Sequence, residues 1–130
     1  MRFAALLLAL AAVASAVPLS RRDEIASCGN GGDIDVTRIL SQVQQAPREN
    51  RSSGYPHQFK NYEGLPMSSD CDGASMMLEL PVFADGHPYN LQNGENPGAV
   101  RAIYSIDDNA LCAIIAHDNY GSDFHLCPMQ

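Results

Sequence analysis

The chain has 130 residues, of which 15 are acidic and 8 are Lys or Arg, and its formal net charge is −7 at pH 7. All the acidic residues but only five of the cations lie in residues 23–130, because Arg2, Arg21 and Arg22 come earlier, and this stretch has a balance of −10. That charge excludes proteins that hold nucleic acid through broad basic surfaces, since such binding requires clustered Lys and Arg. Any chemistry on a phosphate must depend on a few cations placed locally.

The first residues have the features of a secretory leader. Arg2 is followed by an apolar run over 3–13 and by Ala14-Ser15-Ala16, a pattern that signal peptidase accepts. A membrane anchor is the alternative, but polar residues resume at Ser20, before the roughly 20 apolar residues that a span requires. A plain charged terminus is the alternative to a pro-segment that ends at the dibasic pair. We expect a signal peptide over 1–16, a pro-segment over 17–22 and one mature domain over 23–130.

Four cysteines follow the expected leader: Cys28, Cys71, Cys112 and Cys127. An even number in a secreted chain of this size predicts two disulfides, and four cysteines allow three connectivities. A bond from first to last would close nearly the whole domain and, in the loop-entropy model, contribute about 4 to 5 kcal/mol. A zinc site is the alternative, but the sequence lacks a C-x-x-C motif, so no metal is expected.

The first predicted element after residue 23 is a helix. Gly29–Gly32 forms a turn, and Asp33 or Asp35 then caps a helix that ends near Ala46. Its apolar positions at helical spacing are Ile34, Ile39, Leu40 and Val43.

A polar segment over 48–54 follows the helix. Within it, Asn50-Arg51-Ser52 matches the sequon for N-glycosylation, which matters only in a chain that enters the secretory pathway. The sequence alone leaves the occupancy of Asn50 open.

The remainder is predicted as short strands separated by Gly, Pro and Asn turns. The strands cover 55–60, 75–83, 99–106, 111–117 and 123–127. Because side chains alternate between the two faces of a strand, one apolar face collects Met76, Leu78, Leu80, Val82, Val100, Ala102, Tyr104, Cys112, Ile114 and Ala116. The helix is expected to cover that face. Glu79, Arg101 and His117 are out of phase with these residues, so the other face collects polar groups.

The polar residues form a set suited to phosphodiester cleavage without a metal. That reaction needs a base for the 2'-hydroxyl, an acid for the departing 5' oxygen and cations for the phosphorane. We assign Glu79 as the base with a charged His57 beside it, and His117 as the acid, since a histidine pKa of about 6.5 allows proton exchange in both directions. Arg101 supplies a permanent charge and a planar set of donors for phosphate oxygens.

The segment Tyr55–Gly64, YPHQFKNYEG, closely resembles the guanine-site segment of the fungal guanyl-specific ribonucleases. That family includes purine-preferring members and the sarcin-type ribotoxins. Three further blocks resemble the family in the same order, namely Leu78–Pro81 with its glutamate, Pro97–Arg101 with its arginine and Ile114–His117 with its final histidine. Phe124, just before the last cysteine, is similar too, and the resemblance covers nearly all of residues 23–130.

The resemblance implies an α+β fold, with one α-helix packed on a twisted antiparallel β-sheet and two disulfides. It implies a bond between Cys28 and Cys127, and a bond between Cys71 and Cys112 would match the purine-preferring relatives. The implied activity is that of a secreted, extracellular endoribonuclease that cuts single-stranded RNA after guanosine through a 2',3'-cyclic phosphate. The protein is expected to need no cofactor, to act as a monomer and to make no membrane contact in its mature form. The sequence does not identify a host protein or an inhibitor protein that binds it.

The resemblance also assigns residues around the substrate. Tyr55 donates to the phosphate and Phe124 excludes water, while Phe59 and Tyr62 sandwich the purine between them. The Glu63 carboxylate accepts from the guanine N1–H and exocyclic amine. The base-binding set is Phe59, Lys60, Asn61, Tyr62, Glu63 and Ser122. Phe59 stands where a tyrosine is usual, and Lys60 and Ser122 where asparagines are common, differences that bear on the strictness of guanine preference.

Two other functions remain as alternatives. A secreted effector on this scaffold would bind RNA or a host protein without turnover, although the catalytic set would then usually be lost. A glycosidase would need a second carboxylate beside Glu79, which the sequence does not offer. His87 and His125 match no motif and are expected to be structural or surface residues.

Overall fold

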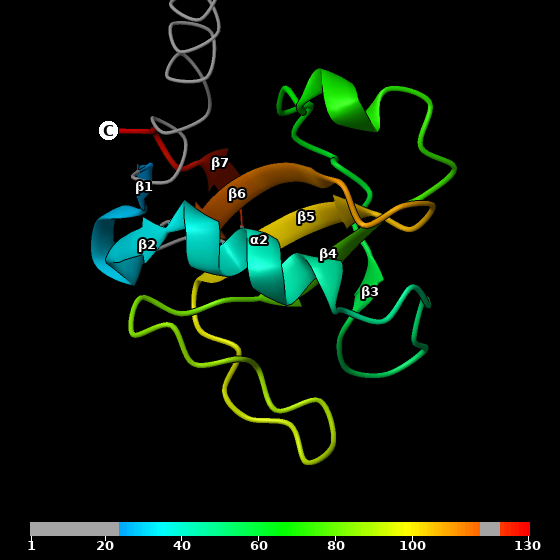
Figure 1. The fold of residues 1–130 in the computed structure, drawn as a ribbon, viewed down its shortest axis with the longest axis horizontal. Helices are drawn as coiled ribbons and strands as arrows, with labels where there is room; N and C mark the ends of the chain where they lie inside the picture. Colours follow the sequence, from blue (N-terminus) through cyan, green and yellow to red (C-terminus); the bar gives the residue numbers. More distant parts are fainter. Residues whose placement is uncertain (1–23, 118–122) are drawn as a thin grey trace, which may run out of the picture.

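The computed structural model describes residues 24–117 and 123–130, and it has one α-helix lying across one face of an antiparallel sheet (Figure 1). The predicted α+β architecture is confirmed. The sheet has five strands in the order β3-β4-β5-β6-β7. Its strands are β3 (His57–Gln58), β4 (Met77–Pro81), β5 (Val100–Ser105), β6 (Leu111–His117) and β7 (Phe124–Leu126). The expected leader and pro-segment, and the predicted base-site residue Ser122, lie outside the described residues.

Helix α2 (Val36–Gln44) begins directly after Asp35, whose side chain accepts a hydrogen bond from the backbone N–H of Arg38 at 3.4 Å. This is the N-cap that the sequence predicted as one of two choices. The helix buries Val36, Ile39 and Val43 against the sheet. Leu40 was predicted to join them but is 37% exposed, because it lies at the edge of this apolar stripe. In the described ranges, no helix has the length and apolarity needed to cross a membrane.

A small hairpin precedes the helix, and the sequence did not predict it. β1 (Ile25–Ser27) pairs with β2 (Asp33–Asp35) across the 3-10 turn η2 (Gly29–Gly31). Ile34 is fully buried in β2, so its assignment to the helix was wrong. Strands of three residues are too short to display an alternating pattern, which is why the hairpin escaped detection.

The main core lies between the helix and one face of the sheet, as the alternation predicted. Its strand residues include Leu78, Leu80, Val100, Ala102, Tyr104, Ile114 and Ala116, and Val82, directly after β4, belongs to it too. Cys112 was predicted on this face but packs with Phe59, Ile103 and Ile115 on the other. The reason is a shift in the pairing of β5 with β6, where Tyr104 faces Leu111 while Ile103 faces Ala113. The extra residue interrupts the alternation, as a β-bulge does.

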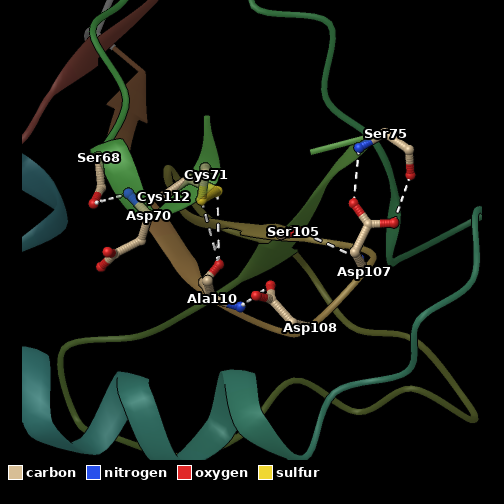
Figure 2. The surroundings of a disulfide bond; sticks show 9 residues. All are labelled: Ser68, Asp70, Cys71, Ser75, Ser105, Asp107, Asp108, Ala110 and Cys112. Atoms are coloured by element: carbon tan, nitrogen blue, oxygen red, sulfur yellow. Dashed lines mark hydrogen bonds between the residues drawn. A yellow bond between two sulfur atoms is a disulfide. The ribbon is translucent and has the colours of Figure 1, made fainter. Parts of the chain in front are cut away.

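Two disulfides tie the chain together in the pairing that the resemblance implied. Cys28 is bonded to Cys127 and joins the two ends of the domain. Cys71, in the 3-10 turn η3 (Ser69–Cys71), is bonded to Cys112 at the start of β6 (Figure 2). On the neighbouring turn, both carboxylate oxygens of Asp107 accept hydrogen bonds from Ser75, at 2.8 Å from its N–H and 2.6 Å from its hydroxyl.

Candidate active site

The strand register collects the predicted polar residues on the face that the helix leaves open. His57 is paired directly with Glu79, and Phe124 directly with His117. Arg101 lies between them, because Glu79 faces Ile103 on β5, two residues along from Arg101. On the other side Arg101 faces Ile115 on β6, two residues before His117. Side chains at such diagonal positions are within reach of one another when they are long.

Glu79 is a nearly buried carboxylate between the side chains of His57 and Arg101. Its side chain is 12% exposed, with Oε1 3.0 Å from Nε2 of His57 and Oε2 3.4 Å from Nε of Arg101. Burial raises the pKa of Glu79 above its ordinary value of 4.5, and His57, Arg101 and His117 offset only part of that effect. A carboxylate whose pKa is raised in this way is a stronger proton acceptor than a solvated one, which suits a general base.

His57 is oriented from both of its ring nitrogens. Nδ1 lies 2.7 Å from the carbonyl oxygen of Gly54, and Nε2 lies 3.0 Å from Glu79. The carbonyl oxygen of Gly54 can only accept a hydrogen bond, so Nδ1 is placed to donate to it while Nε2 faces the carboxylate. The two contacts therefore fix the orientation of the imidazole beside Glu79. The Tyr55 ring stacks on His57 with the centroids 4.5 Å apart.

Arg101 is fixed by the backbone around it. Its side chain is 5% exposed, and Nη1 donates to the carbonyl oxygens of Pro97, Gly98 and Val100 at 3.2, 2.9 and 3.0 Å. Nη2 donates to the hydroxyl of Tyr55 at 3.1 Å. Because Nη1 is occupied, Nη2 is the amino group with donor capacity left for a further acceptor. The Tyr55 oxygen accepts from Arg101, so its own hydroxyl proton remains available to another acceptor.

His117 ends β6 and lies against β7. Its ring contacts that of Phe124, with centroids 3.9 Å apart. Its Nδ1 atom is buried and has no hydrogen-bond partner among the described residues. A proton donor in this position has one face covered by an aromatic ring, which limits access of water to it.

Apolar side chains lie beside the polar set on the same face of the sheet, and the sequence did not predict them there. Phe59, Ile103 and Ile115 are buried in a second cluster, with Phe124 and Leu126 packed against it. Alternation pointed to a polar face here, yet Ile103 and Ile115 lie fully buried on it. Ile103 and Ile115 are the strand partners of Glu79 and Arg101, so this second core contributes to the burial of these two side chains, and a buried environment strengthens their interaction. The carbonyl that orients His57 was also missed, since a backbone group leaves no signal in the sequence.

The predicted base-binding loop borders a groove next to Glu79. The residues that line it are Gln58, Phe59, Lys60, Asn61, Tyr62, Glu63, Glu79, Asp123 and Phe124. Phe59 is only 5% exposed and meets the edge of Phe124, while Tyr62 is 85% exposed. Oε2 of Glu63 accepts a hydrogen bond from the backbone N–H of Phe124 at 2.9 Å, which ties the loop to β7.

Asn61 shapes the same loop through its side chain. Its Nδ2 donates to the carbonyl oxygen of Leu65 at 2.9 Å and its Oδ1 accepts from the Leu65 N–H at 2.8 Å. Asn61 has a positive φ of 50°, a conformation that asparagine tolerates better than most residues. These bonds occupy the side chain, so the backbone of this turn is what remains for a bound base.

The other two histidines lie away from this face. His87 lies in the 82–99 loop with Nδ1 2.6 Å from Asp85 and Nε2 3.0 Å from Glu95, and its ring stacks on Phe83. Hydrogen bonds to Glu95 and Asp85 raise the pKa of His87 above its ordinary value of 6.5. These contacts fit the structural role expected for it. His125 lies on β7, with Nδ1 3.1 Å from the Leu126 carbonyl oxygen.

Comparison with known proteins agrees with the resemblance that the sequence indicated. A family model described as ribonuclease matches residues 21–128. Guanyl-specific ribonuclease U1 of Ustilago sphaerogena is 36% identical over 103 residues, covering 78% of this chain and 92% of that protein. Ribonuclease alpha-sarcin of Aspergillus giganteus is 35% identical over 118 residues, covering 67% of this chain and 66% of the toxin.

Solved structures agree in fold. The Aspergillus ribotoxin restrictocin, in complex with a 29-mer RNA analogue of the sarcin/ricin domain, superposes with a TM-score of 0.59 at 31% identity. That alignment covers 73% of this chain and 84% of restrictocin. The matched sequence, the shared architecture and the ordered motifs agree, and the chain belongs to the fungal ribonuclease family that contains the guanyl-specific ribonucleases and the sarcin-type ribotoxins.

Proposed function

We propose that the protein is a secreted endoribonuclease that cleaves single-stranded RNA after guanosine, by transfer to a 2',3'-cyclic phosphate followed by hydrolysis. The observation that supports this most is the Glu79 carboxylate, which lies between His57 at 3.0 Å and Arg101 at 3.4 Å. A base with a raised pKa, next to a fixed cation, is what the first step requires.

In the first step, Glu79 accepts the proton of the 2'-hydroxyl while that oxygen attacks phosphorus. His57 donates to Glu79 and orients it toward the ribose. Charge that develops on the phosphorane oxygens is stabilised by Nη2 of Arg101 and the hydroxyl of Tyr55, which are already hydrogen-bonded to each other at 3.1 Å. His117 protonates the departing 5' oxygen from the opposite side of the phosphate.

In the second step the two proton carriers exchange roles. His117, now neutral, accepts a proton from a water molecule that attacks the cyclic phosphate, and Glu79 returns its proton to the 2' oxygen. Arg101 and Tyr55 act on the same phosphate oxygens in both steps. The residues themselves supply the base, the acid and the cation, so we expect turnover in the presence of EDTA.

Guanine preference is proposed to arise in the 59–63 loop. Tyr62 can cover one face of the base over the Phe59 wall of the groove, and an aromatic stack contributes about 1 to 3 kcal/mol per base. Glu63 has one carboxylate oxygen bonded to Phe124 and a second available for the guanine N1–H and amine. Adenine lacks this pair of donors. Lys60, Asn61 and Ser122 complete the proposed set.

The proposed export rests on the leader over 1–16, the pro-segment over 17–22 and the two disulfides. Disulfides form and persist in oxidising compartments. N-terminal sequencing of the protein recovered from the culture medium of a fungal host tests this, with a first residue near Asp23 expected. A chain that stays in the cytosol with an intact N-terminus would overturn it.

Cleavage of dinucleotides distinguishes this function from its alternative. Mature protein is incubated with GpC, ApC and UpC in EDTA, with Glu79→Gln and His117→Ala as matched variants. We expect GpC to be cleaved first and a cyclic phosphate to appear before the 3'-phosphate. No turnover of any dinucleotide, together with retained RNA binding, would favour the effector that binds RNA without cutting it.

A further inference from the structure

The N-glycosylation sequon takes no part in the proposed cleavage site. Asn50-Arg51-Ser52 is the one N-x-Ser/Thr triplet without proline in this sequence. It lies between α2 and β3, outside regular secondary structure, and both Asn50 and Ser52 are exposed. The acceptor side chain of Asn50 and the Ser52 hydroxyl, which the oligosaccharide transferase recognises, therefore lie on the surface.

The two polar atoms of the Asn50 side-chain amide differ in their hydrogen bonding. Oδ1 accepts from the backbone N–H of Gln58 at 2.9 Å. Across residues 24–117 and 123–130, Nδ2 of Asn50 donates no hydrogen bond. N-glycosylation attaches sugar to Nδ2 and leaves the amide oxygen able to accept, so the bond to Gln58 would survive the modification.

The neighbouring residues hold the segment in place. The backbone N–H of Arg51 donates to the carbonyl oxygen of Pro56 at 3.0 Å. The Arg51 side chain donates to Glu49 at 3.1 Å and to the carbonyl oxygen of Leu91 at 3.2 Å. None of these contacts involves Nδ2 of Asn50, so a glycan on that atom breaks none of these hydrogen bonds.

We propose that Asn50 carries an N-linked glycan, an inference that rests on the proposed secretion. Nδ2 attacks the anomeric carbon of a lipid-diphosphate-linked oligosaccharide, forming a C–N bond. The bond from that carbon to the diphosphate oxygen breaks, the lipid diphosphate leaves, and the amide gives up one proton to the transferase.

The position of Asn50 determines where the sugar lies. Gln58 belongs to β3, the edge strand of the five-stranded sheet, and Asn50 contacts the backbone of that strand. The proposed glycan therefore leaves the protein at the edge of the sheet, and we place it beside the cleavage face, next to Gln58 at the border of the groove. Covering an open edge is one way in which proteins prevent pairing with other chains.

Intact mass of the secreted protein tests the modification. The full chain, with its own leader, is expressed in a eukaryotic host, and the protein in the medium is weighed before and after treatment with peptide N-glycosidase. We expect a mass excess of hexose and N-acetylhexosamine units that the enzyme removes, leaving Asp at position 50. Ser52→Ala should abolish the excess, while Ser53→Ala, one residue outside the sequon, should retain it.

Each outcome bears on one of the two proposals. Protein in the medium at its unmodified mass, identical to the Ser52→Ala variant, overturns the glycan alone. A chain retained in the cytosol overturns the proposed secretion, and the glycan with it. The rate of GpC cleavage should agree within about twofold between the glycosylated protein and Ser52→Ala. A loss of tenfold or more in the glycosylated form would overturn the placement of the sugar outside the cleavage face.

Discussion

Substitution of Glu79 by Gln separates what this carboxylate does for catalysis from what it costs the fold. Gln keeps the shape of the side chain and removes its charge and its capacity to accept a proton as a base. Loss of a general base lowers the rate by about 100-fold to 10,000-fold, and we expect GpC cleavage to fall within this range. Since the parent side chain is only 12% exposed, removal of the charge also relieves a desolvation penalty.

The sign of the stability effect follows from the raised pKa of Glu79. A group whose pKa is higher in the folded state stabilises the protein fully below its unfolded value, here 4.5, and that contribution is lost as the pH rises through the folded pKa. Each unit of increase corresponds to about 1.4 kcal/mol, or roughly 5 to 10 °C in Tm for a domain of this size. The Gln variant cannot titrate, so its Tm relative to the parent should rise as the pH increases above 4.5 and through the folded-state pKa of Glu79.

Thermal unfolding followed by circular dichroism at several pH values measures this difference. Asp107→Asn is a control of opposite sign, because hydrogen bonds from Ser75 lower the pKa of Asp107. The Asp107 contribution is present above the unfolded value of 3.8 and lost as the pH falls. The control should therefore become less stable than the parent as the pH rises. If Glu79→Gln behaves like Asp107→Asn, attraction to His57 and Arg101 outweighs burial and the reasoning given for the base is wrong.

Three further substitutions test other parts of the site. His117→Ala should lower GpC cleavage by at least about 100-fold with a far smaller effect on thermal unfolding, and a rate near that of the parent would remove His117 as the acid. Arg101→Lys keeps the charge but loses the bonds to three carbonyl oxygens, so the free energy of unfolding measured in urea should fall by about 2 kcal/mol or more. Unchanged stability and an unchanged cleavage rate would contradict the role of the guanidinium. The double variant Cys71→Ala with Cys112→Ala opens a loop of sequence separation 41, so the free energy of unfolding measured in urea should fall by about 4 kcal/mol. A decrease below about 1 kcal/mol would indicate that the disulfide constrains the unfolded chain little.

Much of the site was predictable because strand alternation is a local property. The phase of Glu79 against Leu78 and Leu80 could be determined from the sequence, and the same holds for Arg101 against its neighbours. The helix cap at Asp35 was likewise one of two local choices. Where the pattern is interrupted, the prediction was wrong, as at Cys112, because the bulge that reverses its face arises from pairing with β5.

Contacts between segments were not encoded in any local pattern. The carbonyl of Gly54 orients His57, and the carbonyls of Pro97 and Gly98 hold Arg101, but backbone groups are the same in every residue. The burial that raises the pKa of Glu79 likewise depends on strands that are distant in the chain.

The amino-acid sequence by itself determined the helix, the strands of the five-stranded sheet and the orientation of Glu79, Arg101 and His117 away from the main core, since these follow from periodicity over a few residues. Only the tertiary structure decided the β1–β2 hairpin, the strand register, the second apolar cluster beside the polar residues and the distances from Glu79 to His57 and Arg101. The physical reason is that register and burial arise from pairing between strands far apart in sequence, and a shift of one residue would turn each of these side chains to the opposite face.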